Sequence, residues 1–268
     1  MKAKFMSLAS GSSGNCYYIG VENYGILIDA GIAVRTIKKR LKEAGIPMES
    51  VRAVFVTHDH ADHIKGVGGL GEKLHIPIYT TAAIHQGINR SYCVTEKLHT
   101  CVHHIDKQQP LQIADIGIEA FEVPHDGTDN VGYCINIAGN NFVFLTDLGE
   151  ITSIAAPYIR RANYLVMEAN YDEKMLRTGV YPEHLKRRIQ SSTGHLSNLT
   201  TANFLAEHFD TQLRHVWLCH LSKDNNTPEL AYNTVAQKLH EKGVVAGTDV
   251  QLQALSRNTA SQLYEFEL

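Results

Sequence analysis

The feature that most constrains this chain is the run "THDHADH" at residues 57–63. It follows directly on "VRAVFV", an unbroken stretch of mainly apolar residues that predicts a buried strand. Side chains in extended backbone alternate between two faces, so His58 and His60 are expected to point the same way. Asp62 and His63 fall on the following turn, and their side chains can face a second position close to the one that His58 and His60 face. One short segment therefore offers ligands to two metal ions.

The residue types in this run match the chemistry of divalent metals. Three imidazoles and a carboxylate suit zinc or another borderline divalent ion. Further ligand-type residues follow other predicted strands: His125 in "EVPHDG", Asp147 in "FVFLTDLG" and His220 in "HVWLCHLS". Strand ends that converge on one edge of a sheet are common sites of chemistry. Asp29, which closes "GILIDAG", is expected to brace the histidine run as a hydrogen-bond acceptor.

The order of predicted elements is strands first, then alternating helices and strands, which favours one domain with mixed sheets and outer helices. No Pro-rich or Ser-rich linker and no repeat interrupts the chain, so residues 1–268 are expected to form a single domain. The expected helices are 33–44, 150–160, 182–190, 198–208 and 228–240. The expected strands are 4–9, 16–21, 24–29, 51–57, 77–80, two within 111–123, 131–138, 141–146, 163–168, 214–218, 250–254 and 262–267.

Composition narrows the class of protein and its surroundings. The net charge is −3 with neutral histidines, so any binding of a polyanion needs a local basic patch. Five cysteines at scattered positions indicate free thiols in a reducing compartment, and we expect a cytoplasmic protein. No apolar run approaches the length of a membrane span, and the first residues do not read as a signal peptide.

Together, "THDHADH" and the three later residues resemble the metallo-β-lactamase superfamily. The resemblance implies an α/β fold, a four-layer αββα sandwich, and two divalent metal ions, zinc or manganese. By the same resemblance one ion takes His58, His60 and His125, the other takes Asp62, His63 and His220, and Asp147 bridges them.

Three segments are similar to the tRNase Z branch of that superfamily: "LVMEANYD", "TGHLSNLTTANFLAEHF" and "LCHLSKDNN". In those phosphodiesterases a Glu–His pair serves the leaving group, and here the matching residues are Glu168 and His195. Met167 stands where that branch carries another histidine. His195 also precedes Ser197, a predicted helix N-cap, so a structural role at the helix start is the alternative. Asp62 could orient the attacking water or accept its proton.

The chain leaves no room for the tRNA-grasping arm of tRNase Z, because only a short hairpin separates His125 from Asp147. It also lacks the large inserted domain of RNase J-type nucleases. The compact core that remains resembles the YycJ/WalJ group of bacterial proteins, which implies 5′-to-3′ exonuclease action on DNA that has a 5′ end. The alternatives are an RNA-processing nuclease, a small-molecule hydrolase for a cyclic phosphodiester, lactone or thioester, and a non-catalytic metal-binding protein.

Candidate contacts to a nucleic acid lie in two loops. The small-residue loop "SGSSGN" supplies Ser12, Ser13 and Asn15 as uncharged donors to phosphate. The loop after His220 supplies Lys223 and Asn225. Two basic segments, 186–188 and 38–40, are further candidates. We interpret the segment at 38–40 as a solvated helix face.

Overall fold

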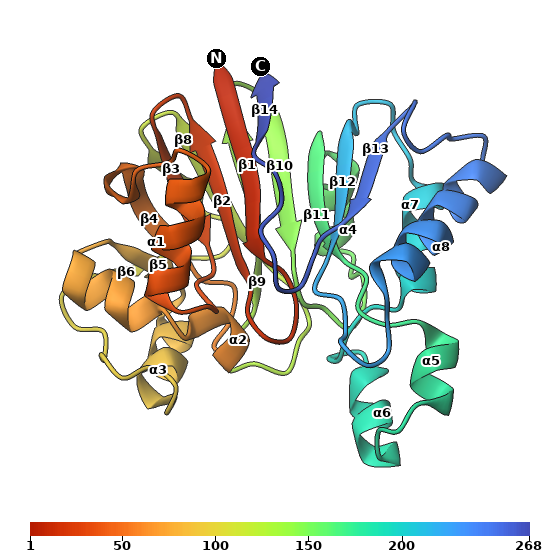
Figure 1. Cartoon of the computed structure of the whole chain (residues 1–268), viewed down its shortest axis with the longest axis horizontal. Coiled ribbons are helices and arrows are strands. Elements are labelled where there is room, and N and C mark those ends of the chain that lie inside the picture. Colours follow the sequence, from red (N-terminus) through yellow and green to blue (C-terminus); the bar gives the residue numbers. More distant parts are fainter. The chain divides into compact units, whose positions relative to one another are not determined.

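The computed structural model describes residues 1–268, and the chain divides into two compact units. The first unit comprises Met1–Ala120, Gly127–Val131 and Ser256–Leu268. The second comprises Phe121–Asp126 and Gly132–Leu255. Both ends of the chain belong to the first unit, where the first and last strands pair (Figure 1). A single domain over the whole chain stays a prediction.

The first unit is built on a mixed sheet in which antiparallel strands precede parallel ones. The strand order is β14–β1–β2–β3–β4–β5–β6, antiparallel up to β3 and parallel from β3 to β6. The strands are β1 (Lys2–Ala9), β2 (Cys16–Val21), β3 (Tyr24–Ile28), β4 (Val51–Phe55), β5 (Ile78–Thr80), β6 (Val102–His104) and β14 (Tyr264–Glu267). The helices are α1 (Val34–Glu43), η1 (Met48–Ser50), α2 (Ala61–Ile64), η2 (Gly69–Lys73) and α3 (Ala82–Arg90). Strands β7 (Leu111–Ile113) and β8 (Ile116–Glu122) form an antiparallel hairpin that belongs to the second sheet of the chain.

The second unit also combines a mixed sheet with helices. Its strands lie in the order β13–β12–β11–β10–β9, parallel from β13 to β10 and antiparallel between β10 and β9. The strands are β9 (Val131–Ile137), β10 (Asn140–Leu145), β11 (Tyr164–Glu168), β12 (His215–Cys219) and β13 (Gln251–Ala254). The helices are α4 (Ala155–Arg160), α5 (Glu173–Thr178), α6 (Glu183–Ile189), α7 (Asn198–Glu207) and α8 (Pro228–Glu241). Helix α7 packs against α8, and α8 packs against β13 (Figure 1).

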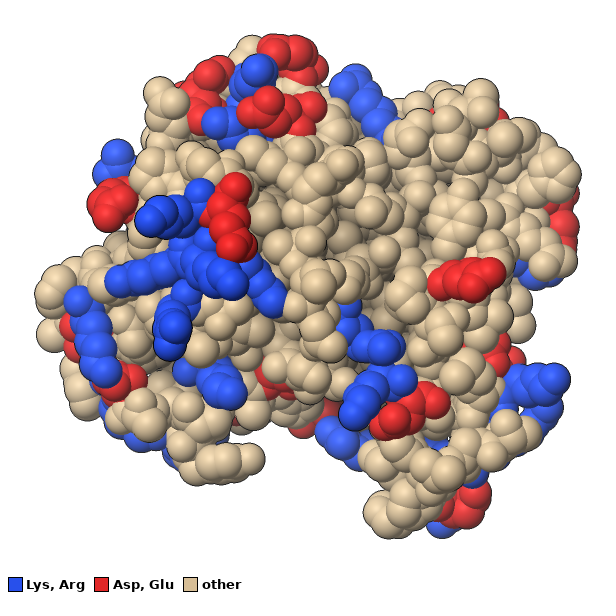
Figure 2. Space-filling view, in the orientation of Figure 1, with Lys and Arg blue, Asp and Glu red and all other residues tan.

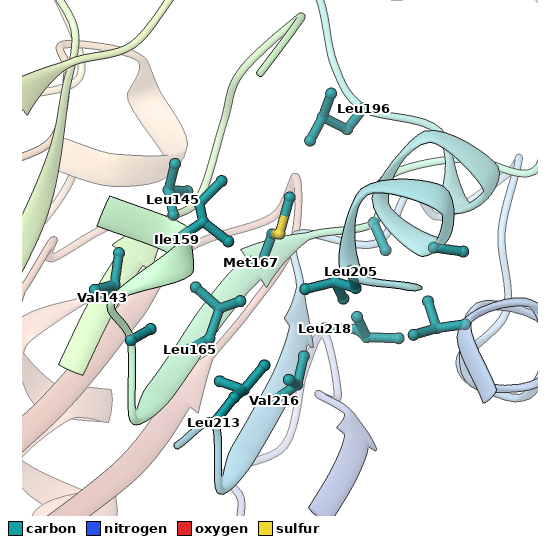
Figure 3. Packing of buried hydrophobic residues seen from close by; sticks show 14 of the residues in the cluster. Val143, Leu145, Ile159, Leu165, Met167, Leu196, Leu205, Leu213, Val216 and Leu218 are labelled. Carbon is teal, nitrogen blue, oxygen red and sulfur yellow. The ribbon is translucent and has the colours of Figure 1, made fainter. Parts of the chain in front are cut away.

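The core of the second unit follows the two-residue period of its strands. Alternate residues of β10, β11 and β12 point toward one face and pack with Ile159 of α4 and Leu205 of α7 (Figure 3). The residues between them are buried as well, which explains why these strands read as continuous apolar runs. This packing holds in place the carboxyl ends of β10, β11 and β12, where several buried polar residues lie.

Most elements expected from the sequence are confirmed, with shifts at their ends. The helix expected over 150–160 is Ala155–Arg160, because the Thr152 hydroxyl accepts a hydrogen bond from the Ala155 N–H and the helix starts there. The expected N-cap is confirmed: the Ser197 hydroxyl accepts from the N–H of Thr200 at the start of α7. All five cysteines are free, and no helix is long and apolar enough to span a membrane.

Gly31 has no room for a side chain. It follows β3 and donates its N–H to the Asn15 carbonyl, and a Cβ at this position would overlap the backbone carbonyl of Asp62. We expect Gly31→Ala to displace the segment that carries Asp62 and to lower the melting temperature by at least about 4 °C. Differential scanning calorimetry measures this. The control is Gly69→Ala, where the nearest neighbour of the added Cβ is a side-chain methyl of Val34 at 3.0 Å and not backbone; equal melting temperatures for the two variants would contradict the prediction.

Candidate metal centre

The "His-rich loop", residues 57–63, begins just after β4 and is held by a buried carboxylate from the end of β3. Asp29 accepts hydrogen bonds from the Thr57 N–H at 2.8 Å and from His63 Nδ1 at 2.7 Å. Because β3 and β4 are parallel neighbours, their carboxyl ends lie at the same edge of the sheet. Asp29 has a φ of 59°, a left-handed backbone conformation that a non-glycine residue keeps only where its surroundings fix it. The geometry places Asp29 where the sequence predicts it, against the histidine run.

The imidazole rings of the His-rich loop lie close together. The ring of His58 is 4.7 Å from that of His60 and 4.0 Å from that of His63, measured between centroids. His63 turns Nδ1 toward Asp29, and its Nε2 lies 3.7 Å from Asp62 Oδ2. Burial raises the pKa of Asp29, and the attraction of His63 opposes that rise. A histidine whose Nδ1 is held by a carboxylate has its Nε2 oriented for a metal.

The loop at residues 10–15 joins β1 to β2 and reaches the His-rich loop, so its expected hairpin is confirmed. Asn15 is buried, and its Nδ2 lies 2.9 Å from His63 Nε2 and 3.3 Å from Asp62 Oδ2. Its backbone N–H donates to the Asp62 carbonyl at 2.7 Å. Ser12 and Ser13 are exposed at the tip of the same hairpin.

In the second unit a "strand-end cluster" gathers Asp147, Glu168, His195 and His220, whose candidate ligand atoms all lie within 4.8 Å of one another. Asp147, Glu168 and His220 follow or end the parallel strands β10, β11 and β12, and His195 precedes α7. His220 Nδ1 lies 2.8 Å from Asp147 Oδ1 and 3.1 Å from Glu168 Oε1. His220 also has a left-handed φ of 52°. Adjacent parallel strands bring these side chains together, as their positions in the sequence predict.

Glu168 and His195 form a tight pair in this cluster. His195 Nδ1 lies 2.7 Å from Glu168 Oε1, while Glu168 Oε2 accepts from the N–H groups of Leu148 and Leu196. Burial by itself lowers the pKa of His195, whereas the carboxylates of Glu168 and Asp147 raise it, and the net pKa lies above its usual value. Burial raises the pKa of Glu168, whereas His195 and His220 together lower it, and the net pKa lies below its usual value. The pair thus favours an imidazolium beside a carboxylate.

His125 stands beside the strand-end cluster. Its Nδ1 lies 2.8 Å from the Gly194 carbonyl oxygen, and its Nε2 lies 3.9 Å from Asp147 Oδ1. The hydrogen bond at Nδ1 fixes the ring and leaves Nε2 toward the carboxylate of Asp147. Imidazole nitrogens and carboxylate oxygens braced in this way fit divalent metal ions.

Comparison with known proteins places the chain in a family. A profile described as a β-lactamase superfamily domain matches residues 24–221. The chain belongs to the β-lactamase superfamily. It is 34% identical over 259 residues to exodeoxyribonuclease YycJ of Bacillus anthracis, covering 92% of this chain and 93% of that protein. It is also 34% identical over 262 residues to exodeoxyribonuclease WalJ of Streptococcus pneumoniae serotype 2, strain D39, covering 98% and 97%.

The fold of this superfamily member agrees with a solved structure. The metallo-β-lactamase fold protein YhfI from Bacillus subtilis superposes with a TM-score of 0.70, at 18% identity and over 99% of both chains. The predicted fold class is therefore confirmed. The family, its exonuclease relatives and the His and Asp clusters make the protein a metal-dependent hydrolase.

Sequence reasoning missed two residues that hold the histidines. The Thr57 hydroxyl lies 3.0 Å from His58 Nδ1 and bonds Asp29, and Asn170 Nδ2 donates to the His220 carbonyl oxygen at 2.8 Å. Both stand within two residues of a residue already singled out, which is the signal that could have found them. Of the predicted substrate contacts after His220, Lys223 is exposed, whereas Asn225 is buried and receives the Asp172 N–H at its backbone carbonyl.

Proposed function

We propose that this protein is a phosphodiester hydrolase that uses two divalent ions, zinc or manganese, to degrade DNA from its 5′ end in the cytoplasm. The observation that carries the proposal is the pair of Glu168 and His195 within the strand-end cluster. A phosphodiester has a poor leaving group, so a positioned proton donor beside metal ligands suits its hydrolysis. The two full-length relatives named exodeoxyribonucleases favour DNA as the polymer.

The family resemblance supplies the proposed division of ligands. By that resemblance, His58, His60 and His125 would hold one ion, Asp62, His63 and His220 would hold the other, and Asp147 would contribute to both. Divalent ions in such sites provide a nucleophile at neutral pH and stabilise the charge that develops on phosphate.

Asp62 and His195 act on the water and the leaving group in this proposal, and Asn15 and Glu168 hold them in place. Asp62 orients the attacking water, and Asn15 Nδ2 donates a hydrogen bond to the Asp62 carboxylate at 3.3 Å. His195, kept protonated by Glu168, donates a proton to the departing sugar oxygen. The His195 side chain is 18% exposed, which leaves it open to a substrate.

The test of this function compares substrates and directions. Metal-loaded protein is incubated with end-labelled DNA, with RNA of the same sequence and with a small phosphodiester. Two further DNA strands carry nuclease-resistant phosphorothioate linkages at the 5′ or the 3′ end. We expect the protein to degrade the unmodified DNA and the strand blocked at its 3′ end. The strand blocked at its 5′ end should stay intact. Hydrolysis of the small ester alone would instead favour a small-molecule hydrolase, and equal loss of RNA would favour an RNA-processing nuclease.

The exposed serines of the β1–β2 loop give a separate prediction for substrate binding. The hydroxyls of Ser12 and Ser13 have no hydrogen-bond partner within the protein, so they are available to phosphate. We expect Ser12→Ala/Ser13→Ala to weaken DNA affinity about 5- to 20-fold, the loss of two modest hydrogen bonds, with metal content unchanged. Fluorescence anisotropy measures it against the exposed control Thr211→Ala/Thr259→Ala. Unaltered affinity would leave these serines as turn residues only.

A further inference from the structure

Helix α1 carries a concentration of positive charge that the rest of the chain does not share. Its ten residues hold five cations and one acid, whereas the whole chain has 25 basic and 28 acidic residues. Ile37 and Leu41 face the interior of the first unit. Figure 2 shows the blue basic side chains gathered over the region that α1 occupies in Figure 1. On a helix face that only contacts solvent, positively and negatively charged side chains normally alternate, and on this face they do not.

The cations of α1 differ in whether the protein already uses them. Lys39 pairs with Glu43 at 3.7 Å, and Arg40 donates to the carbonyl oxygens of Leu8 and Asn258. Arg35, Lys38 and Lys42 are exposed and form no ion pair. They lie three and four residues apart and therefore on one face of the helix. With Arg52 of β4, also exposed and in no ion pair, we call these four residues the "basic track".

By contrast, the basic segment 186–188 is largely engaged by the protein itself. Lys186 is buried and donates to the Arg177 carbonyl, and Arg188 Nε lies 2.6 Å from Asp126 Oδ2. Because these cations already donate hydrogen bonds to acceptors within the protein, they are less available to bind phosphate. The basic track is the better candidate for contact with a polyanion.

The basic track ends in a cavity. Three of its residues, Lys38, Lys42 and Arg52, line a cavity of about 850 Å³, together with His75 and one acid, Glu49. The remaining wall is mostly apolar and includes Ile46, Met48, Leu74 and Ile76. Cations at the rim and an apolar wall behind them suit a nucleotide unit, whose phosphate and base need those two surroundings.

The other end of α1 lies at the His-rich loop. Ala30 donates its N–H to the His63 carbonyl, and Gly31 donates to the Asn15 carbonyl, three residues before the helix begins. From Arg35 to Lys42 the helix rises about 10 Å, at 1.5 Å per residue. The basic track thus runs from the loop that carries the predicted metal ligands to the cavity, all within the first unit.

We propose that the basic track binds the backbone of the DNA strand whose end is being hydrolysed, and that the cavity receives a nucleotide farther along that strand. This inference rests on the proposed function, since it names the path of the same substrate. Continuity from the His-rich loop to the cavity is what favours a strand over a free nucleotide. Each cation neutralises one phosphate, so the contact is independent of sequence and sensitive to salt.

The experiment reverses charge on the track and at a matched place elsewhere. The variant is Lys38→Glu/Lys42→Glu, and the control is Lys238→Glu/Lys242→Glu, a second lysine pair four residues apart at the C-terminal end of α8. Binding of phosphorothioate DNA, which resists cleavage, is measured by anisotropy with strands of about 15 and about 3 nucleotides over a range of salt. We expect the track variant to bind the long strand at least about 10-fold more weakly. The slope of the logarithm of its affinity against the logarithm of salt concentration should become shallower by about 1.4, or about 0.7 for each lost cation. Affinity for the short strand stays within about 2-fold, and the control matches the wild type.

Equal affinity of the track variant and the control for the long strand would overturn the inference. So would an equal loss for the long strand and for a free deoxynucleotide, which would make the cavity a nucleotide site instead. The milder variant Lys38→Gln/Lys42→Gln repeats the measurement if charge reversal unfolds α1. Failure of the proposed function is a different result: the wild type would then bind the long strand through the track and leave unprotected DNA intact.

Discussion

Replacing Asp147 with asparagine is expected to remove bound divalent metal and to lower DNA hydrolysis by at least about 10³-fold, or about 4 kcal/mol of barrier. Asp147 is buried at the end of β10, and its Oδ1 lies 2.8 Å from His220 Nδ1. Asparagine keeps the shape of the side chain and removes the negative charge, which is what a ligand shared by two cations supplies. Mass spectrometric metal analysis after dialysis, and initial rates on end-labelled DNA, measure the two effects.

The control for Asp147 is Asp106→Asn, which removes the same charge from an exposed position. It should keep both the metal content and the rate of the wild type. Chelation of the wild-type protein should abolish hydrolysis, and adding zinc or manganese should restore it. An Asp147→Asn protein that retains its metal and its rate would contradict the assignment of this residue as a ligand.

The strand-end positions could be predicted because they follow from local patterns. A buried strand reads as an apolar run, and in parallel strands the residue after each run lies at one edge. Asp147 and His220 were found in this way, and the structure brings them together with Glu168 and His195. Asp29 was found because it ends the strand beside β4.

Contacts between segments distant in sequence could not be predicted in this way. Nothing in the run 186–188 shows that Arg177 and Asp126 supply its acceptors. Nor does the sequence show the cavity beside α1, because residues from 38 to 77 form it together. The late start of α4 depends on one hydrogen bond, in which the Thr152 hydroxyl accepts from the Ala155 N–H and competes with the helical pattern before it.

Replacing His195 with alanine is expected to lower the turnover of DNA by about 10²- to 10⁴-fold while metal content stays at the wild-type level. The ring is partly exposed and its Nδ1 is bonded to Glu168, which leaves Nε2 for the leaving group. Its backbone N–H bonds the Ile189 carbonyl and survives the substitution. Rates on DNA and metal analysis of the same preparation measure both quantities, with the exposed His240→Ala as control.

The proton-donor role makes a sharper prediction when the leaving group is varied. A departing sugar oxygen needs a proton, whereas p-nitrophenolate is stable as an anion. His195→Ala should therefore lose less than about 10-fold on bis(p-nitrophenyl) phosphate while losing at least about 100-fold on DNA. A merely structural residue would weaken both reactions alike, so the ratio of the two losses separates proton donation from support of the fold.

Glu168→Gln extends the comparison to the partner of His195. Glutamine can still accept from the N–H of Leu148 or Leu196, but it cannot attract the imidazolium, so the pKa of His195 should fall. The rate on DNA should then decline at a lower pH than in the wild type, because His195 loses its proton earlier. The rate on the p-nitrophenyl ester should not share that shift. If both substrates shifted together, or if metal were lost with Glu168, the pair would be supporting His220, the proposed metal ligand, rather than the leaving group.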